Sequence, residues 1–126
     1  MTIVDLDLLA TFRAATQCGW CRKPTPSGCD PAHLWARGLG GAHRIDASFN
    51  LIALCRLCHT EAHAGNIARE DLLLMVAHRD GVNQCDIVAA VHFLQRIPKH
   101  WNRERIEAGM EELDGGARVL VRRVLK

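Results

Sequence analysis

Four cysteines, arranged as two Cys-x-x-Cys pairs, constrain what this chain can fold into more than any other feature. The first pair is Cys18 and Cys21, and the second is Cys55 and Cys58. Each pair can bind one ion through two thiolates, and two pairs complete the tetrahedral coordination that zinc prefers. Because four thiolates leave no open position on the ion, the sequence predicts a structural zinc site. The alternative is a set of buried or redox-active cysteines without a metal.

The spacing of the two pairs adds a second constraint. The segment between them, residues 22–54, is longer than the ~15–20 residues that separate the pairs of a simple zinc ribbon. We therefore expect an inserted structure between the knuckles, and this segment contains His33, a glycine-rich stretch at 38–41 and Asn50. Of the two remaining cysteines, Cys29 could compete as a zinc ligand but has no paired cysteine beside it, and Cys85 is predicted to be a small core residue.

A pair of histidines follows the second knuckle directly. His59 and His63 are spaced so that both imidazoles lie on one face of a helix and can reach one ion. Glu61 does not turn this pair into a zinc-protease motif, because it follows His59 by two residues and points roughly 200° around the helix. The alternative interpretation of the pair is an exposed polar face.

Local patterns predict a mixture of short strands and helices. Apolar runs at 34–36 and 51–54 indicate the two strands of a hairpin, and a loop is expected at 22–31. Periodicity and capping residues predict further helices at 3–15, from near Cys58 to Gly65, at 69–79, from Asn83 to before Pro98, and from Asn102 to Gly115-Gly116. Residues 117–126 fit either a helix or a strand. The predicted class is a small α+β fold.

Composition limits the partners and the compartment. The net charge is only +2, so the chain as a whole is not a polybasic binder, although basic residues lie among the motifs. No apolar run approaches the roughly 20 residues of a membrane span, and residues 1–12 lack the basic start of a signal peptide. We expect a cytoplasmic protein with no membrane partner, in which paired cysteines indicate metal rather than disulfides.

The region from Cys18 to Gly65 resembles the HNH nuclease family, also called ββα-metal nucleases. The first H corresponds to His33 in DPAHLWARGLGG, the N to Asn50 in DASFNLIALC, and the last H to His59 in CRLCH. Small phage and prophage members are most similar in style, with an AHL segment, a glycine-rich loop and an N-L-x-x-L-C-x-x-C-H ending. The resemblance implies a zinc-stapled ββα-metal core at 1–66 and a helical appendage at 67–126.

The resemblance also implies an activity, the hydrolysis of DNA phosphodiester bonds by a metal-dependent endonuclease. His33 would be the general base, and His59 with His63 would hold a divalent ion, Mg²⁺, Mn²⁺, Ni²⁺ or Zn²⁺, on the scissile phosphate. Asn50 would brace the loop and orient the strand that carries His33. The phosphate-binding candidates are Arg37, Arg44 and Arg56.

One position departs from the family pattern. Many members carry a metal ligand immediately before the general base, where this chain has Ala32. Asp30 is the nearest residue that can replace that ligand. Without it, two imidazoles and water remain, a set that suits zinc, nickel or cobalt better than magnesium.

Two other functions remain open. One is a zinc-stabilised module, inactive or weakly active as a nuclease, that binds DNA in phage recombination or DNA processing. The other is a protein-interaction domain whose apolar helices between 69 and 113 pair with a partner or, as a homodimer, with a second copy.

Overall fold

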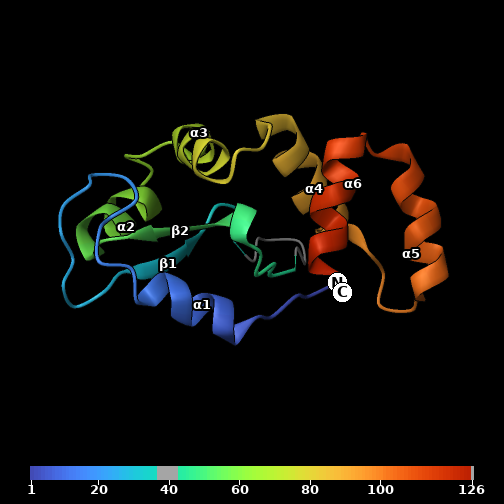
Figure 1. Ribbon diagram of the computed structural model, residues 1–126, viewed down its shortest axis with the longest axis horizontal. Helices are drawn as coiled ribbons and strands as arrows, with labels where there is room; N and C mark the ends of the chain where they lie inside the picture. The colour runs from blue at the N-terminus through green and yellow to red at the C-terminus, as the bar shows by residue number, and fades with distance from the viewer. Residues whose placement is uncertain (37–42, 126) are drawn as a thin grey trace.

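The structure is a computed structural model that describes residues 1–36 and 43–125. It has an α+β fold in which the described residues form six α-helices, two short 3-10 helices and one two-stranded antiparallel sheet. Figure 1 shows the hairpin with α1 and α2 at one end of the molecule and α4, α5 and α6 at the other. The predicted glycine-rich stretch at 38–41 lies outside the described residues.

The hairpin consists of β1 (Asp30–His33) and β2 (Leu51–Leu54), with His33 opposite Leu51. The prediction for β2 is confirmed, but the prediction of a strand at 34–36 is wrong, because β1 ends where that run begins. Trp35 cannot continue the ladder, since its N–H and C=O both bond to the side chain of Asn50. The short helix η1 (Ser48–Asn50) leads directly into β2.

Helix α1 (Leu6–Arg13) is shorter than the 3–15 predicted, and the residues before it form a different contact. Asp5 caps the helix by accepting a hydrogen bond from the backbone N–H of Leu8 at 3.0 Å. Ile3 forms a parallel bridge with Ile45, which takes its backbone out of the helix. Helix α2 (Arg56–His63) starts at the second knuckle and ends before Gly65, close to the prediction.

The C-terminal half is helical, as its patterns predicted. It comprises α3 (Arg69–Asp80), α4 (Gln84–Arg96), α5 (Arg103–Gly109) with the 3-10 turn η2 (Met110–Glu112), and α6 (Gly115–Val124). The predicted caps Asn83 and Asn102 each accept a backbone hydrogen bond at the start of a helix. Gly115 and Gly116 begin α6 instead of ending the preceding helix, because Ala117, Leu120 and Val121 become buried as α6 packs on α4.

One buried apolar cluster runs through both halves of the described chain. It includes Leu34, Ile52 and Leu54 around the hairpin and continues through Val76 on α3 to Leu94 on α4. The core therefore shows no break at the predicted boundary between 66 and 67, and that division stays a prediction. No helix within the described residues is long and apolar enough to cross a membrane.

Candidate functional site

The four predicted cysteines come together at the base of the hairpin. The sulfur atoms of Cys18, Cys21, Cys55 and Cys58 all lie within 4.8 Å of one another. Cys18 and Cys58 are buried, whereas Cys21 is exposed. This is the spacing that one tetrahedral ion requires, since Zn–S bonds of about 2.3 Å place neighbouring sulfurs roughly 4 Å apart. The quartet can therefore hold a structural ion such as zinc.

The backbone of each knuckle is shaped for sulfur ligands. The N–H of Trp20 points at the sulfur of Cys18, and the N–H of Cys58 points at the sulfur of Cys55, each at 3.4 Å. Arg22 has a left-handed backbone, with φ of 66°, which turns the chain immediately after Cys21. Such N–H donors stabilise thiolates, the form in which cysteine binds metal.

The thiols of the quartet differ in acidity. Burial raises the pKa of Cys18, but hydrogen bonds from Cys55, Cys21 and Trp20 outweigh it and lower this pKa to about 6. Burial, together with the neighbouring thiols, raises the pKa of Cys58 far above its usual value. Without a metal, the four thiols cannot all ionise near neutral pH, because the thiolates would repel one another. A bound divalent cation would offset this repulsion and allow all four to ionise.

The other two cysteines lie outside the quartet. Cys29 is buried, and its sulfur contacts the hydroxyl of Thr25 at 3.1 Å and the carbonyl of Gln17 at 3.6 Å. Cys85 is exposed on the first turn of α4, so the prediction that it is a core residue is wrong. Its neighbour Ile87 supplies the buried side chain of that turn instead.

The histidine pair projects from α2 toward β1. The Nε2 atoms of His59 and His63 are 3.1 Å apart, close enough for both to reach one ion at the usual Zn–N distance of about 2.0–2.1 Å. Asp30 lies on the other side of the first ring, with its Oδ2 3.0 Å from Nδ1 of His59. In this position Asp30 orients the imidazole that would bind the metal, an arrangement common around metal-binding histidines. Direct ligation by Asp30, as the sequence suggested, would need this contact to open.

Both histidines face a cleft that also contains His33. The cleft has a volume of about 520 Å³ and lies between β1, α2 and the start of α3. Its ionisable and basic lining consists of His33, His59, His63 and Arg69. Ala32 is part of the wall and contributes no ligand. Of the described residues, the cysteine quartet is the one group that brings three or more metal-binding donors together.

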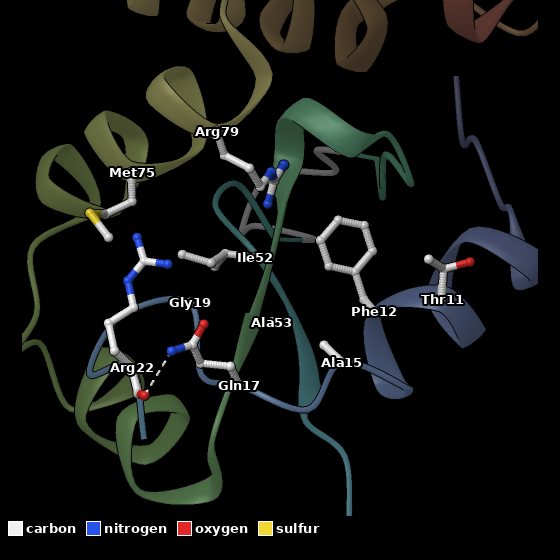
Figure 2. A pocket seen from close by; sticks show the side chains of 10 residues that line it. All are labelled: Thr11, Phe12, Ala15, Gln17, Gly19, Arg22, Ile52, Ala53, Met75 and Arg79. Carbon is white, nitrogen blue, oxygen red and sulfur yellow. Dashed lines mark hydrogen bonds between the residues drawn. The ribbon is translucent and has the colours of Figure 1, made fainter. Parts of the chain in front are cut away.

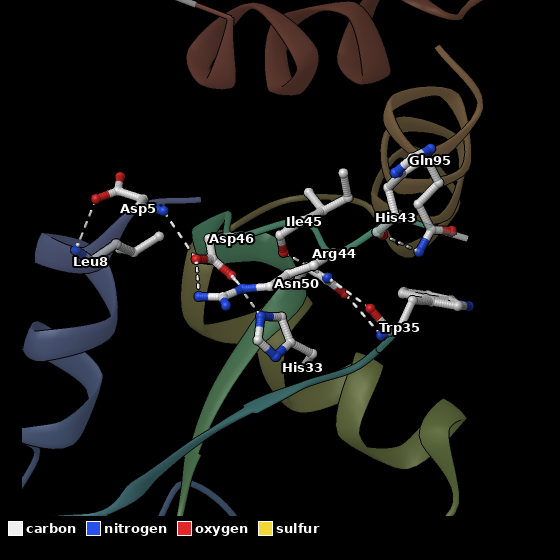
Figure 3. Close-up of polar contacts among 10 residues, drawn as sticks. All are labelled: Asp5, Leu8, His33, Trp35, His43, Arg44, Ile45, Asp46, Asn50 and Gln95. Carbon is white, nitrogen blue, oxygen red and sulfur yellow. Dashed lines mark hydrogen bonds and ion pairs between the residues drawn. The ribbon is translucent and has the colours of Figure 1, made fainter. Parts of the chain in front are cut away.

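His33, at the end of β1, is tied to a buried carboxylate (Figure 3). Its Nε2 lies 2.7 Å from Oδ1 of Asp46, whose side chain is completely buried, while 20% of the His33 side chain stays exposed. Burial raises the pKa of Asp46, but hydrogen bonds from Arg44, His33 and the N–H of Asp5 outweigh it and lower this pKa to about 2. Asp46 is therefore a carboxylate anion at neutral pH.

Asn50 is fully buried and links the strand end to the chain that follows Arg44. Its amide nitrogen donates to the carbonyls of Ile45 at 2.9 Å and Trp35 at 3.1 Å, and its Oδ1 accepts from the N–H of Trp35 at 2.9 Å. Its own carbonyl accepts from the N–H of Leu34, directly after His33. Asn50 thus ties the backbone at the end of β1 to the chain around Ile45 (Figure 3).

The predicted phosphate-binding arginines have different surroundings. Arg44 is engaged with Asp46 through two hydrogen bonds of 2.9 and 2.7 Å. The Arg56 side chain is 85% exposed, with its Nε 3.2 Å from Asp30. Arg37 lies outside the described residues. The sequence analysis did not single out Arg69, the first residue of α3. Arg69 lines the cleft and donates a hydrogen bond to the carbonyl of Leu34 at 2.9 Å.

A second hollow lies between α1, β2 and α3 (Figure 2). It has a volume of about 310 Å³ and a largely apolar floor that includes Phe12, Ile52 and Met75. Arg22 and Arg79 reach its edge, but no cysteine, histidine or acidic side chain lines it. The lining of this hollow therefore offers no side chain for metal binding or for proton transfer near neutral pH.

Comparisons with known proteins give no assignment: no protein-family model matches the chain, and neither the curated proteins nor the solved structures contain a match.

Proposed function

We propose that this protein is a metal-dependent endonuclease of the HNH type that hydrolyses DNA phosphodiester bonds. The observation that carries the proposal is the shared cleft, which His33 and the His59/His63 pair line together beside the four-cysteine site. Metal-assisted phosphodiester hydrolysis requires a general base and metal ligands that face the same bound substrate.

Each residue of the cleft has a separate role in this reaction. His33 takes a proton from the water that attacks phosphorus, and His59 and His63 hold the divalent ion. When bound, this ion stabilises negative charge on the phosphate and the leaving oxygen. Asp30 keeps the His59 ring in its ligating orientation, and Asn50 fixes the backbone beside His33. The products would carry 5′-phosphate and 3′-hydroxyl ends.

Two cationic side chains support a nucleic-acid substrate. Arg69 lines the cleft, and Arg56 stands on the exposed side of α2 next to Asp30. Guanidinium groups bind phosphate oxygens through paired hydrogen bonds, so both are suited to positioning a DNA backbone. Arg37 stays a prediction, while Arg44 is already committed to Asp46.

Cleavage of supercoiled plasmid by the zinc-loaded chain tests this function directly. Nicked and linear DNA should form with one or more of Mg²⁺, Mn²⁺, Co²⁺ and Ni²⁺, and the two-imidazole site favours the last two. His63→Ala should slow cleavage and raise the ion concentration required, whereas His78→Ala, at an exposed histidine far along α3, should cut like wild type. Equal cleavage by wild type and His63→Ala would contradict the metal assignment.

The second candidate is a DNA-binding module that does not cut. The observation in its favour is that His59 and His63 have no third protein donor converging on them among residues 1–36 and 43–125. It predicts salt-sensitive DNA binding and intact plasmid with every ion. Binding measured beside the cleavage assay separates the two functions.

A further inference from the structure

The strongest unexplained feature beside the cleft is the set of contacts around Asp46. Its Oδ1 faces Nε2 of His33 at 2.7 Å and Nε of Arg44 at 2.9 Å. Its Oδ2 faces Nη2 of Arg44 at 2.7 Å and the backbone N–H of Asp5 at 3.0 Å. The three groups from Arg44 and Asp5 can only donate, and the carboxylate side chain is completely buried.

These contacts decide which nitrogen of His33 carries hydrogen. An ionised carboxylate only accepts hydrogen bonds, so the nitrogen that faces it must be the donor. A neutral imidazole has a single N–H, and here it is at Nε2. The lone pair is therefore on Nδ1, and among the described residues Nδ1 has no hydrogen-bond partner.

We infer that Asp46, clamped by Arg44, is a positioning residue that fixes His33 in the Nε2–H tautomer and makes Nδ1 the proton-accepting nitrogen. The inference rests on the proposed function for the role of His33 as the base. It also gives Arg44 a different task from the phosphate contact predicted from the sequence. Arg44 donates to both oxygens of the carboxylate and so prevents it from turning away from His33.

With this arrangement, every proton that moves during phosphodiester hydrolysis has a donor and an acceptor. A water molecule gives one proton to Nδ1 of His33, and the resulting hydroxide forms the new bond to phosphorus. The bond from phosphorus to the 3′-oxygen breaks, and that oxygen takes a proton from solvent to become a hydroxyl. The imidazolium of His33 is stabilised by the Asp46 anion until it returns its proton to water.

The substitution that tests the inference is Asp46→Asn. Both carboxylate positions face donors, so the new NH₂ group has no acceptor except Nε2 of His33 in its other tautomer. The amide should therefore shift the hydrogen to Nδ1 and remove the basic lone pair from that nitrogen. Asp80→Asn is the matched control, because Asp80 is also paired with an arginine, Arg79, but lies on α3.

Two readouts should be taken on the full zinc-loaded chain above pH 7.5. ¹⁵N–¹H correlation spectra of the His33 ring should show the Nε2–H pattern in wild type and Asp80→Asn and the Nδ1–H pattern in Asp46→Asn. The single-turnover cleavage rate of Asp46→Asn should fall by about 10²- to 10⁴-fold, in line with the loss when a base is held in the wrong tautomer. Cleavage by Asp80→Asn should stay near wild type.

The outcomes separate this inference from the proposed function. An Nδ1–H pattern in wild-type protein would overturn the inference, and this measurement needs no variant to fold. Wild-type cleavage rates in a folded Asp46→Asn protein would overturn it as well. The expected spectra together with no cleavage by wild type, under any ion, would support the role of Asp46 in fixing the ring and refute the nuclease.

Discussion

Asp46 and Asn50 are the two buried polar side chains of the described residues, and both serve the end of β1. Every buried side-chain nitrogen and oxygen in this part of the chain has a partner. A fully bonded polar group in an apolar core costs little and fixes its neighbours in one arrangement, whereas a partly bonded one is costly. In this protein, Asp46 holds the ring of His33, and Asn50 holds the backbone of the next residue, Leu34.

The ionisation of Asp46 makes stability depend on pH in a defined direction. Its pKa is lowered in the folded chain to about 2, below the ordinary value of 3.8, so the stabilisation is present above pH 4 and is lost as pH falls toward 2. Relative to Asp46→Asn, wild type should lose roughly 1 kcal/mol of unfolding free energy between pH 5 and pH 3. Denaturant titration at both pH values measures this difference. A constant difference would show that the Arg44–Asp46 pair does not stabilise the fold.

Gly28 is required by its backbone and by its surroundings. Its φ is +97°, and a Cβ there would lie 2.3 Å from the carbonyl oxygen of Arg13. Gly28→Ala should therefore lower the unfolding free energy by roughly 2–4 kcal/mol, the sum of backbone strain and a steric clash. Gly81→Ala is the control, because Gly81 also has positive φ but open space around it, and it should lose about 1 kcal/mol. Equal losses in denaturant titrations would contradict the clash.

For single residues, the sequence predicted positions best where the spacing of metal-binding side chains determines what they can bind. The cysteine quartet could be predicted because two Cys-x-x-Cys pairs are a specific signature of a metal site. The side-by-side placement of His59 and His63 followed from helical geometry. Asp46 could not be found in this way, because its contact with His33 spans a chain segment whose path the sequence does not reveal.

For helices and strands, capping residues predicted the start of a helix correctly, whereas a short apolar run predicted a strand in the wrong place. Asn83 and Asn102 cap helices because their side chains replace missing backbone partners, a local effect. The apolar run at 34–36 predicts a strand, but the Asn50 side chain binds the backbone of Trp35, and β1 lies earlier in the chain. One buried side chain from elsewhere in the chain thus decided where β1 ends.

This role of Asn50 gives a test at the element scale. Asn50→Ala would leave the N–H and C=O of Trp35 and the C=O of Ile45 without partners, and should lower the unfolding free energy by about 2–4 kcal/mol. Asn66→Ala removes an exposed amide contact with Glu61 and should change it by less than about 0.5 kcal/mol. Denaturant titration of both variants decides the point. A loss below 1 kcal/mol for Asn50→Ala would contradict the bracing role.

For the whole molecule, the buried cluster makes the two halves depend on each other. Leu34 and Ile52 belong to the same cluster as Val76 and Leu94, so the hairpin is supported by the helices that follow it. The helices have no assigned ligand, and their pairing with a second copy stays a prediction. The α+β class could be predicted from periodicity, but the continuous core could not, since it depends on how distant elements pack.

The cysteine quartet should couple metal binding to folding. Purified protein should contain one zinc per chain, and chelation should unfold the knuckles and lower the melting temperature, because structural zinc supplies on the order of 10 kcal/mol. Cys18→Ser should lose the zinc, whereas Cys85→Ser, at an exposed cysteine outside the quartet, should keep it. Elemental analysis and thermal melts check both. Full zinc content and an unchanged melt in Cys18→Ser would show that the quartet does not bind the ion.

The proposed nuclease is tested by the single-turnover cleavage rate of a labelled DNA duplex by wild type and by His33→Ala. Both are loaded with zinc and assayed with the divalent ion that best supports plasmid cleavage. We expect wild type to cut and His33→Ala to cut at least about 100-fold more slowly, the usual contribution of a general base. Equal rates for the two proteins would contradict the role of His33 as the general base, and no cleavage by wild type with any of the ions would contradict the nuclease itself.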